Sequence, residues 1–282
     1  MSDWSELSTD QVSLSFLDEG KGPPILALHG FPDTWRTWDV ASRALVQAGY
    51  RVIRMALRGY APSGIPTDRR YDVAALADDV VSLTDHLDLE RVVILGHDWG
   101  ASTAYELAHR VPERIGAIVA MAVPPPATAI GGWRERVARP HNTYLAAGPL
   151  SDWWLRRSDF AEVRRLYRLW SPGWTGNAQH IRTVIDDLRP RQRSRASVDY
   201  YRGAGPAAAP TELPSMPSLL IYGSDEPQVR RQGFEAAKKG LAAPSRVVRV
   251  EGAGHWPHLE APEVVLGEVE DFLGVCRSNG EL

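Results

Sequence analysis

The sequence has few cysteines and no long apolar runs, features that several classes of protein require. Its 282 residues include a single cysteine, Cys276, which excludes a disulfide framework and a thiolate metal site. No apolar run approaches the ~18 residues of a membrane-spanning helix, and the first ten residues lack the basic start and apolar centre of a signal peptide. These absences predict a soluble, cytoplasmic protein in a reducing compartment.

An excess of charge of one sign is also lacking. The 32 basic and 35 acidic residues nearly balance, and no basic block resembles those that bind nucleic acid or an anionic membrane. We therefore expect neither of these partners, and the length suits one large domain with an insertion. The sequence leaves a homodimer open.

What the chain does have is a regular alternation of short apolar runs with amphipathic stretches. This alternation is typical of an α/β protein with a mostly parallel sheet and helices on both faces. Strands are expected at Val12–Leu17, Pro24–Leu28, Val52–Leu57, Val92–Leu95, Ile115–Ala122, Ser218–Tyr222 and Arg246–Val250. Helices are expected near Thr37–Ala48, Val73–Leu87, Trp99–Arg110, Gln228–Lys239 and Pro262–Val275.

The alternation breaks between Val123 and Pro217. We predict an all-helical insertion, residues 125–213, between two parts of an α/β core, residues 1–124 and 214–282. Its helices are expected at Asp152–Leu155, Phe160–Trp170 and Ala178–Leu188. Five of the ten tryptophans also fall there, namely Trp133, Trp153, Trp154, Trp170 and Trp174. The insertion is expected to lie over the strand ends and to wall a pocket for an apolar or aromatic small molecule, although most of these rings are expected to pack it onto the core.

The most informative motif is Gly96-His-Asp-Trp-Gly100, which joins a predicted strand to a predicted helix. In such a strand-to-helix elbow the central side chain is forced out above the sheet edge. That position usually holds serine, and here it is Asp98. A carboxylate suits displacement at a saturated carbon, because the ester that forms can then be hydrolysed at its own carbonyl.

Three further segments follow predicted strands. In His29-Gly-Phe-Pro32, the N–H of Phe31 could form an oxyanion hole with the N–H of Trp99, and His29 is expected to be structural. In Gly252-Ala-Gly-His255, His255 is the natural general base, with His258 as a weaker competitor.

The last segment, Tyr222–Pro227, supplies a carboxylate that could orient His255, either Asp225 or Glu226. The chain order of nucleophile, acid and base is the one known from serine enzymes of this type of fold. Four motifs at strand ends in this order make coincidence improbable.

These residues resemble the α/β-hydrolase superfamily, and more narrowly its branch of epoxide hydrolases and haloalkane dehalogenases. The resemblance covers nearly the whole chain and includes Leu57-Arg-Gly-Tyr60 with Ser63. It implies an eight-stranded sheet, a helical cap formed by the insertion, a covalent ester on Asp98, and no metal or organic cofactor. The family's register favours Glu226 as the acid, with Asp225 as the alternative.

The resemblance also implies proton donors in the cap. Val198-Asp-Tyr-Tyr-Arg202 is similar to the segment that carries one of two donor tyrosines, which makes Tyr201 the donor and Tyr200 its neighbour. The segment of the other tyrosine reads Pro140-His-Asn-Thr-Tyr144 and is out of register, so the second donor is Tyr144, His141 or absent.

The expected function is that of an epoxide hydrolase, which forms a vicinal diol. Haloalkane dehalogenation is the nearest alternative, with the indole of Trp99 as a halide ligand. A non-hydrolytic cyclase, isomerase or binding protein of the same fold is the third.

Overall fold

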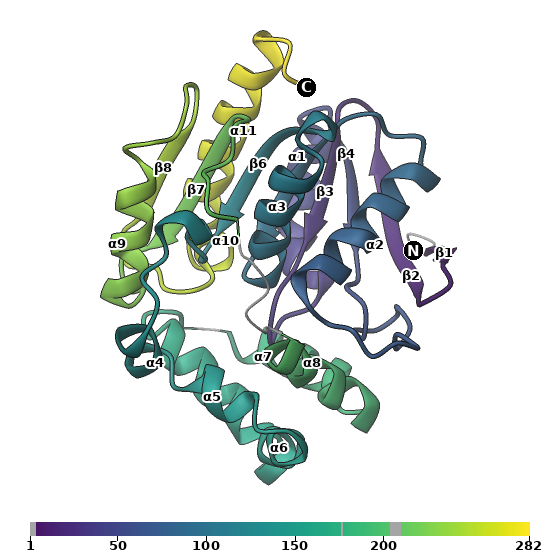
Figure 1. Cartoon of the computed structure of the whole chain (residues 1–282), viewed down its shortest axis with the longest axis vertical. Helices are drawn as coiled ribbons and strands as arrows, with labels where there is room; N and C mark the ends of the chain where they lie inside the picture. Colours follow the sequence, from purple (N-terminus) through teal and green to yellow (C-terminus); the bar gives the residue numbers. More distant parts are fainter. Residues whose placement is uncertain (1–3, 176, 204–209) are drawn as a thin grey trace.

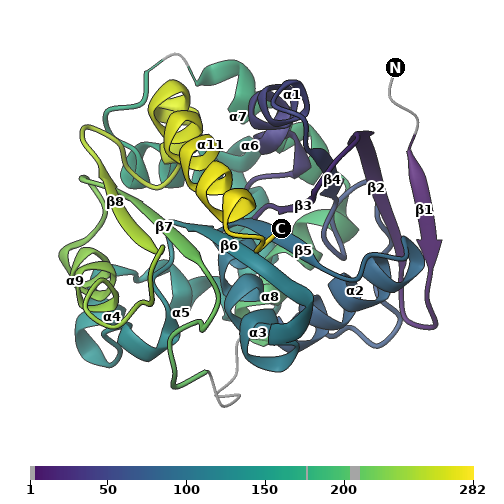
Figure 2. The same ribbon diagram turned by 90° about the horizontal axis from the view of Figure 1, so that it is seen from above.

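The computed structural model describes residues 4–175, 177–203 and 210–282. Within them, eight strands form one sheet in the order β1-β2-β4-β3-β5-β6-β7-β8 (Figures 1 and 2). The strand β2 pairs antiparallel with both neighbours, and every other neighbouring pair is parallel. The bounds are β1 (Ser5–Ser8), β2 (Ser13–Gly20), β3 (Pro24–Leu28), β4 (Arg51–Met55), β5 (Val92–His97), β6 (Ile115–Met121), β7 (Ser218–Gly223) and β8 (Arg246–Val250).

The predicted α/β fold with an eight-stranded, mostly parallel sheet is therefore confirmed. All seven strands expected from apolar runs are present, with ends shifted by at most three residues. The strand β1 was not expected from the sequence, because Ser5–Ser8 is a polar segment of mostly exposed residues at the sheet edge.

Alternation of side chains along the central strands divides the core into two layers. In β3, Ile25 and Ala27 pack on one face, whereas Leu26 and Leu28 pack on the other. The first face is covered by α1 (Asp39–Gln47) and α11 (Pro262–Ser278). The second is covered by α2 (Val73–His86), α3 (Trp99–Arg110) and α9 (Gln228–Ala237). No helix in the described ranges is both long and apolar enough to cross a membrane.

The chain between β6 and β7 forms the helical insertion, which Figure 1 places beyond one end of the sheet. The sequence does not predict three of its helices, namely α4 (Trp133–Ala138), α5 (His141–Leu145) and α8 (Arg191–Gly203). The helix α6 joins two predicted segments across a break at Arg157–Phe160, where the backbone is not helical. Residues 204–209 of the predicted insertion lie outside the described ranges. The elements are η3 (Pro126–Thr128), α4 (Trp133–Ala138), α5 (His141–Leu145), α6 (Pro149–Trp170), α7 (Ala178–Leu188) and α8 (Arg191–Gly203).

Three polar contacts hold the insertion against the loops that follow parallel strands. The Tyr200 hydroxyl donates to the carbonyl of Arg58 at 2.7 Å. His180 Nε2 lies 3.0 Å from Asp33 Oδ2. The N–H of His255 donates to the carbonyl of Trp170 at 2.9 Å. Because Asp33, Arg58 and His255 follow β3, β4 and β8, the insertion covers the carboxyl ends of the strands.

The tryptophans of the insertion do not act as one wall. Trp133, Trp153 and Trp154 are 71%, 59% and 41% exposed. Trp170 and Trp174 instead pack beside Trp256 of the core. The expectation that most of these rings join the insertion to the core is therefore wrong. Two of the five do so, and the other three are exposed.

A buried ion pair supports the loop that meets the insertion. Arg58 donates from Nε and Nη2 to the two carboxylate oxygens of Asp79 in α2, at 2.7 and 2.6 Å. Both side chains are 3% exposed. A two-pronged contact of this kind fixes the Arg58 backbone, whose carbonyl receives the Tyr200 hydroxyl.

We predict that Arg58→Ala lowers the free energy of unfolding by about 3–5 kcal/mol, because it leaves the Asp79 carboxylate buried without its partner. The matched control is Arg110→Ala, which breaks a solvent-exposed pair with Asp78 and should cost about 1 kcal/mol or less. Urea unfolding of the two variants measures the difference. Equal losses would contradict the role given to the buried pair.

Candidate active site

Asp98 occupies a strained elbow between β5 and α3. Its backbone has φ +52° and ψ −109°, a conformation that non-glycine residues rarely adopt. Two neighbouring positions have room only for glycine. A Cβ on Gly100 would lie 2.1 Å from the carbonyl oxygen of Leu28, and a Cβ on Gly30 would lie 2.4 Å from the Cβ of Asp98. The loop after β3 can therefore approach the elbow closely.

This approach brings the first N–H group predicted for the oxyanion hole to Asp98. The backbone N–H of Phe31 donates to Asp98 Oδ1 at 3.0 Å. The backbone N–H of Trp99 stands at the start of α3, as the elbow motif requires. Figure 2 shows β3 and β5 side by side, the arrangement that brings the two loops together.

The His29 side chain forms hydrogen bonds within the core and does not line the cavity bordered by Asp98 and Tyr201. The N–H of Leu57 donates to its Nε2 at 3.2 Å, and its Nδ1 lies 3.2 Å from the carbonyl of Gly30. Burial lowers the pKa of His29 to about 4, so the ring is neutral at neutral pH. It ties the loop after β3 to the loop after β4.

His255 lies between the nucleophile candidate and a carboxylate. Its Nδ1 is 2.7 Å from Glu226 Oε1, and its Nε2 is 3.5 Å from Asp98 Oδ2. The first contact is a hydrogen bond, in which Nδ1 donates because a carboxylate only accepts. The second is too loose for one, and Nε2 has no hydrogen-bond partner among the described residues. A lone pair on Nε2 is therefore free to take a proton beside Asp98.

Asp98, His255 and Glu226 lie in a row, and their charges stabilise one another. Burial opposes the charged form of every member, but for Asp98 the close contact with His255 and its charge outweigh burial and hold the pKa below its usual range. Glu226 likewise has a lowered pKa, because the charge of His255 outweighs burial. The pKa of His255 is raised, because the two carboxylates outweigh its burial.

The alternatives to Glu226 and His255, namely Asp225 and His258, form no ion pair with Asp98 or His255 among the described residues. Asp225 is exposed, and its one side-chain hydrogen bond in the described ranges is accepted from the Ser224 hydroxyl at 3.2 Å. It borders the cavity at His255. His258 stacks on Trp38 and shares a 2.6 Å hydrogen bond with the Thr37 hydroxyl.

A cavity of about 220 Å³ opens directly on Asp98. Tyr201 lines it and is 8% exposed, and its hydroxyl has no hydrogen-bond partner among the described residues. The Tyr201 ring packs edge-on against Phe31, with centroids 5.1 Å apart, and against Trp99 at 5.5 Å. Burial and the charge of Asp98 raise the pKa of Tyr201 well above 10, so it carries its proton. The lining residues are Asp98, Trp99, Ser102, Val123, Arg139, Asn142, Tyr201 and Arg230.

The two candidates for a second proton donor separate clearly. The Tyr144 hydroxyl donates to Glu162 at 2.5 Å, and Tyr144 lines none of the cavities around Asp98 or His255. His141 is buried, faces Tyr201 with centroids 6.3 Å apart, and lines a neighbouring cavity with His255 and Glu226. Burial and the nearby arginines lower the pKa of His141 to about 2. The neutral ring carries an N–H.

Sequence reasoning missed two cations of this site. Arg139 follows α4, and Arg230 lies in the first turn of α9; both border the cavity at Asp98 and its neighbour at His255. Arg139 belongs to none of the sequence motifs. For Arg230, the one indication in the sequence is its position four residues after Glu226, the candidate acid.

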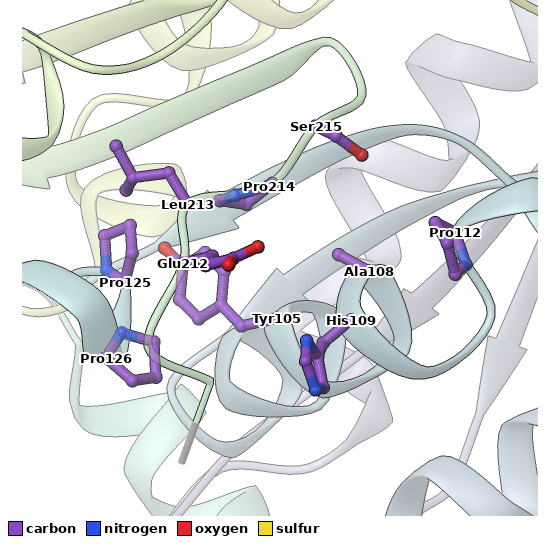
Figure 3. A pocket seen from close by; sticks show the side chains of 10 residues that line it. All are labelled: Tyr105, Ala108, His109, Pro112, Pro125, Pro126, Glu212, Leu213, Pro214 and Ser215. Atoms are coloured by element: carbon purple, nitrogen blue, oxygen red, sulfur yellow. The ribbon is translucent and has the colours of Figure 1, made fainter.

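A separate cavity of about 150 Å³ lies between α3, the start of the insertion and the chain that leads to β7 (Figure 3). Prolines and the side chains of Tyr105, His109 and Glu212 line it, and Asp98, His255 and Glu226 do not. No group of three or more His, Cys, Asp or Glu side chains in the described part of the chain is arranged to hold a metal ion.

The fold and the Asp98–His255–Glu226 row define the class of this protein. Residues 23–262 match the family model of the alpha/beta hydrolase fold, and the chain belongs to that family. The resemblance seen in the sequence motifs is confirmed at this level.

Its relatives carry narrower names. The chain is 29% identical to an epoxide hydrolase of Caballeronia sordidicola, over 95% of this chain and 92% of that protein. It is 28% identical to epoxide hydrolase A of Mycobacterium tuberculosis, over 95% and 96%. The crystal structure of epoxide hydrolase A from Mycobacterium thermoresistibile has a TM-score of 0.79 at 24% identity, covers 96% of this chain and 98% of that one, and shows the shared fold.

We predict that Glu226→Gln lowers the pKa of His255 by roughly 1–3 pH units, because the imidazolium loses the adjacent negative charge. Asp225→Asn is the matched control and should leave that pKa unchanged, since Asp225 is exposed and forms no ion pair with His255 among the described residues. Titration of the histidine side chains by NMR measures both variants. A larger shift in Asp225→Asn than in Glu226→Gln would assign the acid to the other residue.

Proposed function

We propose that this protein is an epoxide hydrolase that converts an epoxide to a vicinal diol through an ester on Asp98. The observation that carries the proposal is the environment of the Asp98 carboxylate. It accepts a hydrogen bond from the Phe31 N–H, lies beside His255, and borders the cavity that Tyr201 lines. The names of the relatives at 28–29% identity support the same reaction.

In the first step, Asp98 Oδ2 attacks a carbon of the epoxide. The carbon–oxygen bond breaks, and the electron pair goes to the oxygen, which takes the proton of the Tyr201 hydroxyl. A hydroxyalkyl ester of Asp98 results. Donation by Tyr201 avoids the release of a bare alkoxide into a buried site.

In the second step, His255 Nε2 takes a proton from water, and the water oxygen attacks the ester carbonyl. The negative charge develops on Oδ1, where the N–H groups of Phe31 and Trp99 stabilise it. The carbonyl re-forms, the diol oxygen leaves with the proton of His255, and the remaining proton restores Tyr201. Glu226 keeps Nδ1 protonated and stabilises the imidazolium.

His141 is the second hydrogen-bond donor to the epoxide oxygen in this proposal, beside Tyr201, which transfers the proton. It is neutral and buried, its Nε2 has no hydrogen-bond partner among the described residues, and its ring faces Tyr201. Tyr144 is not, because its hydroxyl is engaged by Glu162. The insertion, residues 125–213, then acts as the cap that supplies both donors. We also propose a cytoplasmic site of action, which suits the reduced, buried thiol of Cys276.

Dehalogenation is the second candidate. It is favoured by the indole Nε1 of Trp99, which is buried and has no hydrogen-bond partner in the described part of the chain. A halide site commonly needs a second donor, and the exposed Trp133, Trp153 and Trp154 do not line the Asp98 cavity. Halide release measured beside diol formation separates the two reactions, and an unaltered activity in Asp98→Asn would instead favour a non-hydrolytic member of the fold.

We predict that His255→Ala traps the ester, because attack by Asp98 needs no general base whereas hydrolysis does. Mass spectrometry of the variant after incubation with styrene oxide should find the mass of the epoxide on the peptide that contains Asp98. The exposed His109→Ala is the control and should turn over without an adduct. Turnover of the epoxide by wild type with no adduct on the His255→Ala variant would exclude the covalent route.

We predict that Tyr201→Phe and His141→Ala each lower kcat/KM for epoxides, by about 100-fold or more for Tyr201→Phe, because a general acid contributes on the order of 10²–10⁴-fold. Tyr144→Phe is the matched control and should change kcat/KM little. Steady-state kinetics measure all three. A loss in Tyr144→Phe that equals the loss in His141→Ala would return the second donor to Tyr144.

A further inference from the structure

Arg230 is a buried cation at the proposed reaction site. The side chain is 3% exposed and belongs to no ion pair among the described residues. It donates from Nη1 to the carbonyl of Ala122, at the end of β6. A guanidinium has five N–H donors, and this contact is the one side-chain hydrogen bond of Arg230 among the described residues. The residue also lines the cavity at Asp98.

A second cation stands beside the first. Arg139 borders the same cavity, and its only ion pair among the described residues is with Glu135, at 3.3 Å. The two like charges oppose each other, and burial together with Arg139 lowers the pKa of Arg230. Placing two guanidinium groups in one pocket costs free energy. The charges of Glu226, Glu135 and Asp98 oppose this effect at Arg230, but its pKa is still lowered overall, so a further anion would stabilise the pair.

The polar lining of the pocket continues around these cations. Asn142 follows Arg139 by three residues and lines the cavity, and its buried Oδ1 has no hydrogen-bond partner in the described residues. The pocket is therefore lined by cationic and neutral polar groups as well as by the aromatic rings of Trp99 and Tyr201. An apolar epoxide would leave these polar groups without a partner.

The nucleophile makes this arrangement specific. An anionic substrate would be repelled by Asp98, and by Glu226 behind His255, because both carboxylates are held in the charged form. Two fixed cations offset that repulsion, and planar guanidinium groups bind carboxylates and phosphonates by paired hydrogen bonds. A cavity of about 220 Å³ is smaller than most ligand pockets, so the anionic group must lie close to the epoxide.

We propose that Arg139 and Arg230 bind an anionic group, a carboxylate or a phosphonate, of a small epoxide whose ring faces Asp98. The proposal rests on the proposed function for the identity of the reacting group, but the binding of the anion is independent of turnover. Arg139 and Arg230 thus determine specificity, Tyr201 remains the proton donor, and His141 remains the second hydrogen-bond donor.

Calorimetric binding of diol products tests the anion site without any reaction. We expect the full-length protein to bind glycerate or 2,3-dihydroxypropylphosphonate at least tenfold more tightly than the neutral glyceramide. Whichever acid binds more tightly identifies the preferred anion. Arg139→Gln and Arg230→Gln should remove this preference, and Arg139→Lys should keep part of it. The neighbouring Arg136→Gln and Arg231→Gln are matched controls that should preserve it.

Turnover supplies the second measurement. We expect kcat/KM to be at least tenfold higher for glycidate than for the isosteric glycidamide, and the Arg→Gln variants should abolish that ratio mainly through KM. Equal binding of glycerate, the phosphonate and glyceramide by wild type would overturn the anion site. Equal loss of glycidate and glycidamide turnover in folded Arg→Gln variants, with glycerate binding unchanged, would overturn it as well. If glycerate binding follows the arginines but neither epoxide reacts, the anion site stands and the proposed function fails.

Discussion

The close contact between the loop after β3 and the elbow after β5 is the constraint on which the site depends. Gly30 must lie against the Cβ of Asp98, and Gly100 must lie against the carbonyl of Leu28. Only this approach allows the Phe31 N–H to reach Oδ1. The strained backbone of Asp98 is maintained because β5 pairs with β3 and β6, and because the N–H groups of Asp98 and Gly100 donate to the carbonyls of Met121 and His29.

The electrostatic arrangement follows from that geometry. Asp98 Oδ1 is occupied by a backbone donor, so Oδ2 is left to face the cavity and His255. His255 is positioned by Glu226 on one side, and its buried ring separates two carboxylates that would otherwise repel each other. Burial opposes the charged forms of Asp98, His255 and Glu226, but each of these groups has a neighbour of opposite charge that outweighs this effect.

Short patterns in the sequence were sufficient for the parts of the molecule that obey local rules. The bounds of β3, α3, α7 and β8 agree with apolar periodicity, and the Gly96–Gly100 elbow could be recognised because its glycines and its place after a strand are local features. Arg139 and Arg230 could not be found in this way, because they meet only when the insertion folds over α9. The polar edge strand Ser5–Ser8 was missed because pairing with β2, and not apolar burial, holds it in the sheet.

The insertion is more than a cover, because Trp170 accepts the N–H of His255 and Asp33 holds His180. One contact anchors the loop of the base, and the other anchors the loop that carries the Phe31 donor. The insertion is therefore not an exchangeable module of this chain. A recombinant protein that joined this core to another relative's helices would have to reproduce both contacts, or it would disturb the alignment of groups that lie entirely within the core.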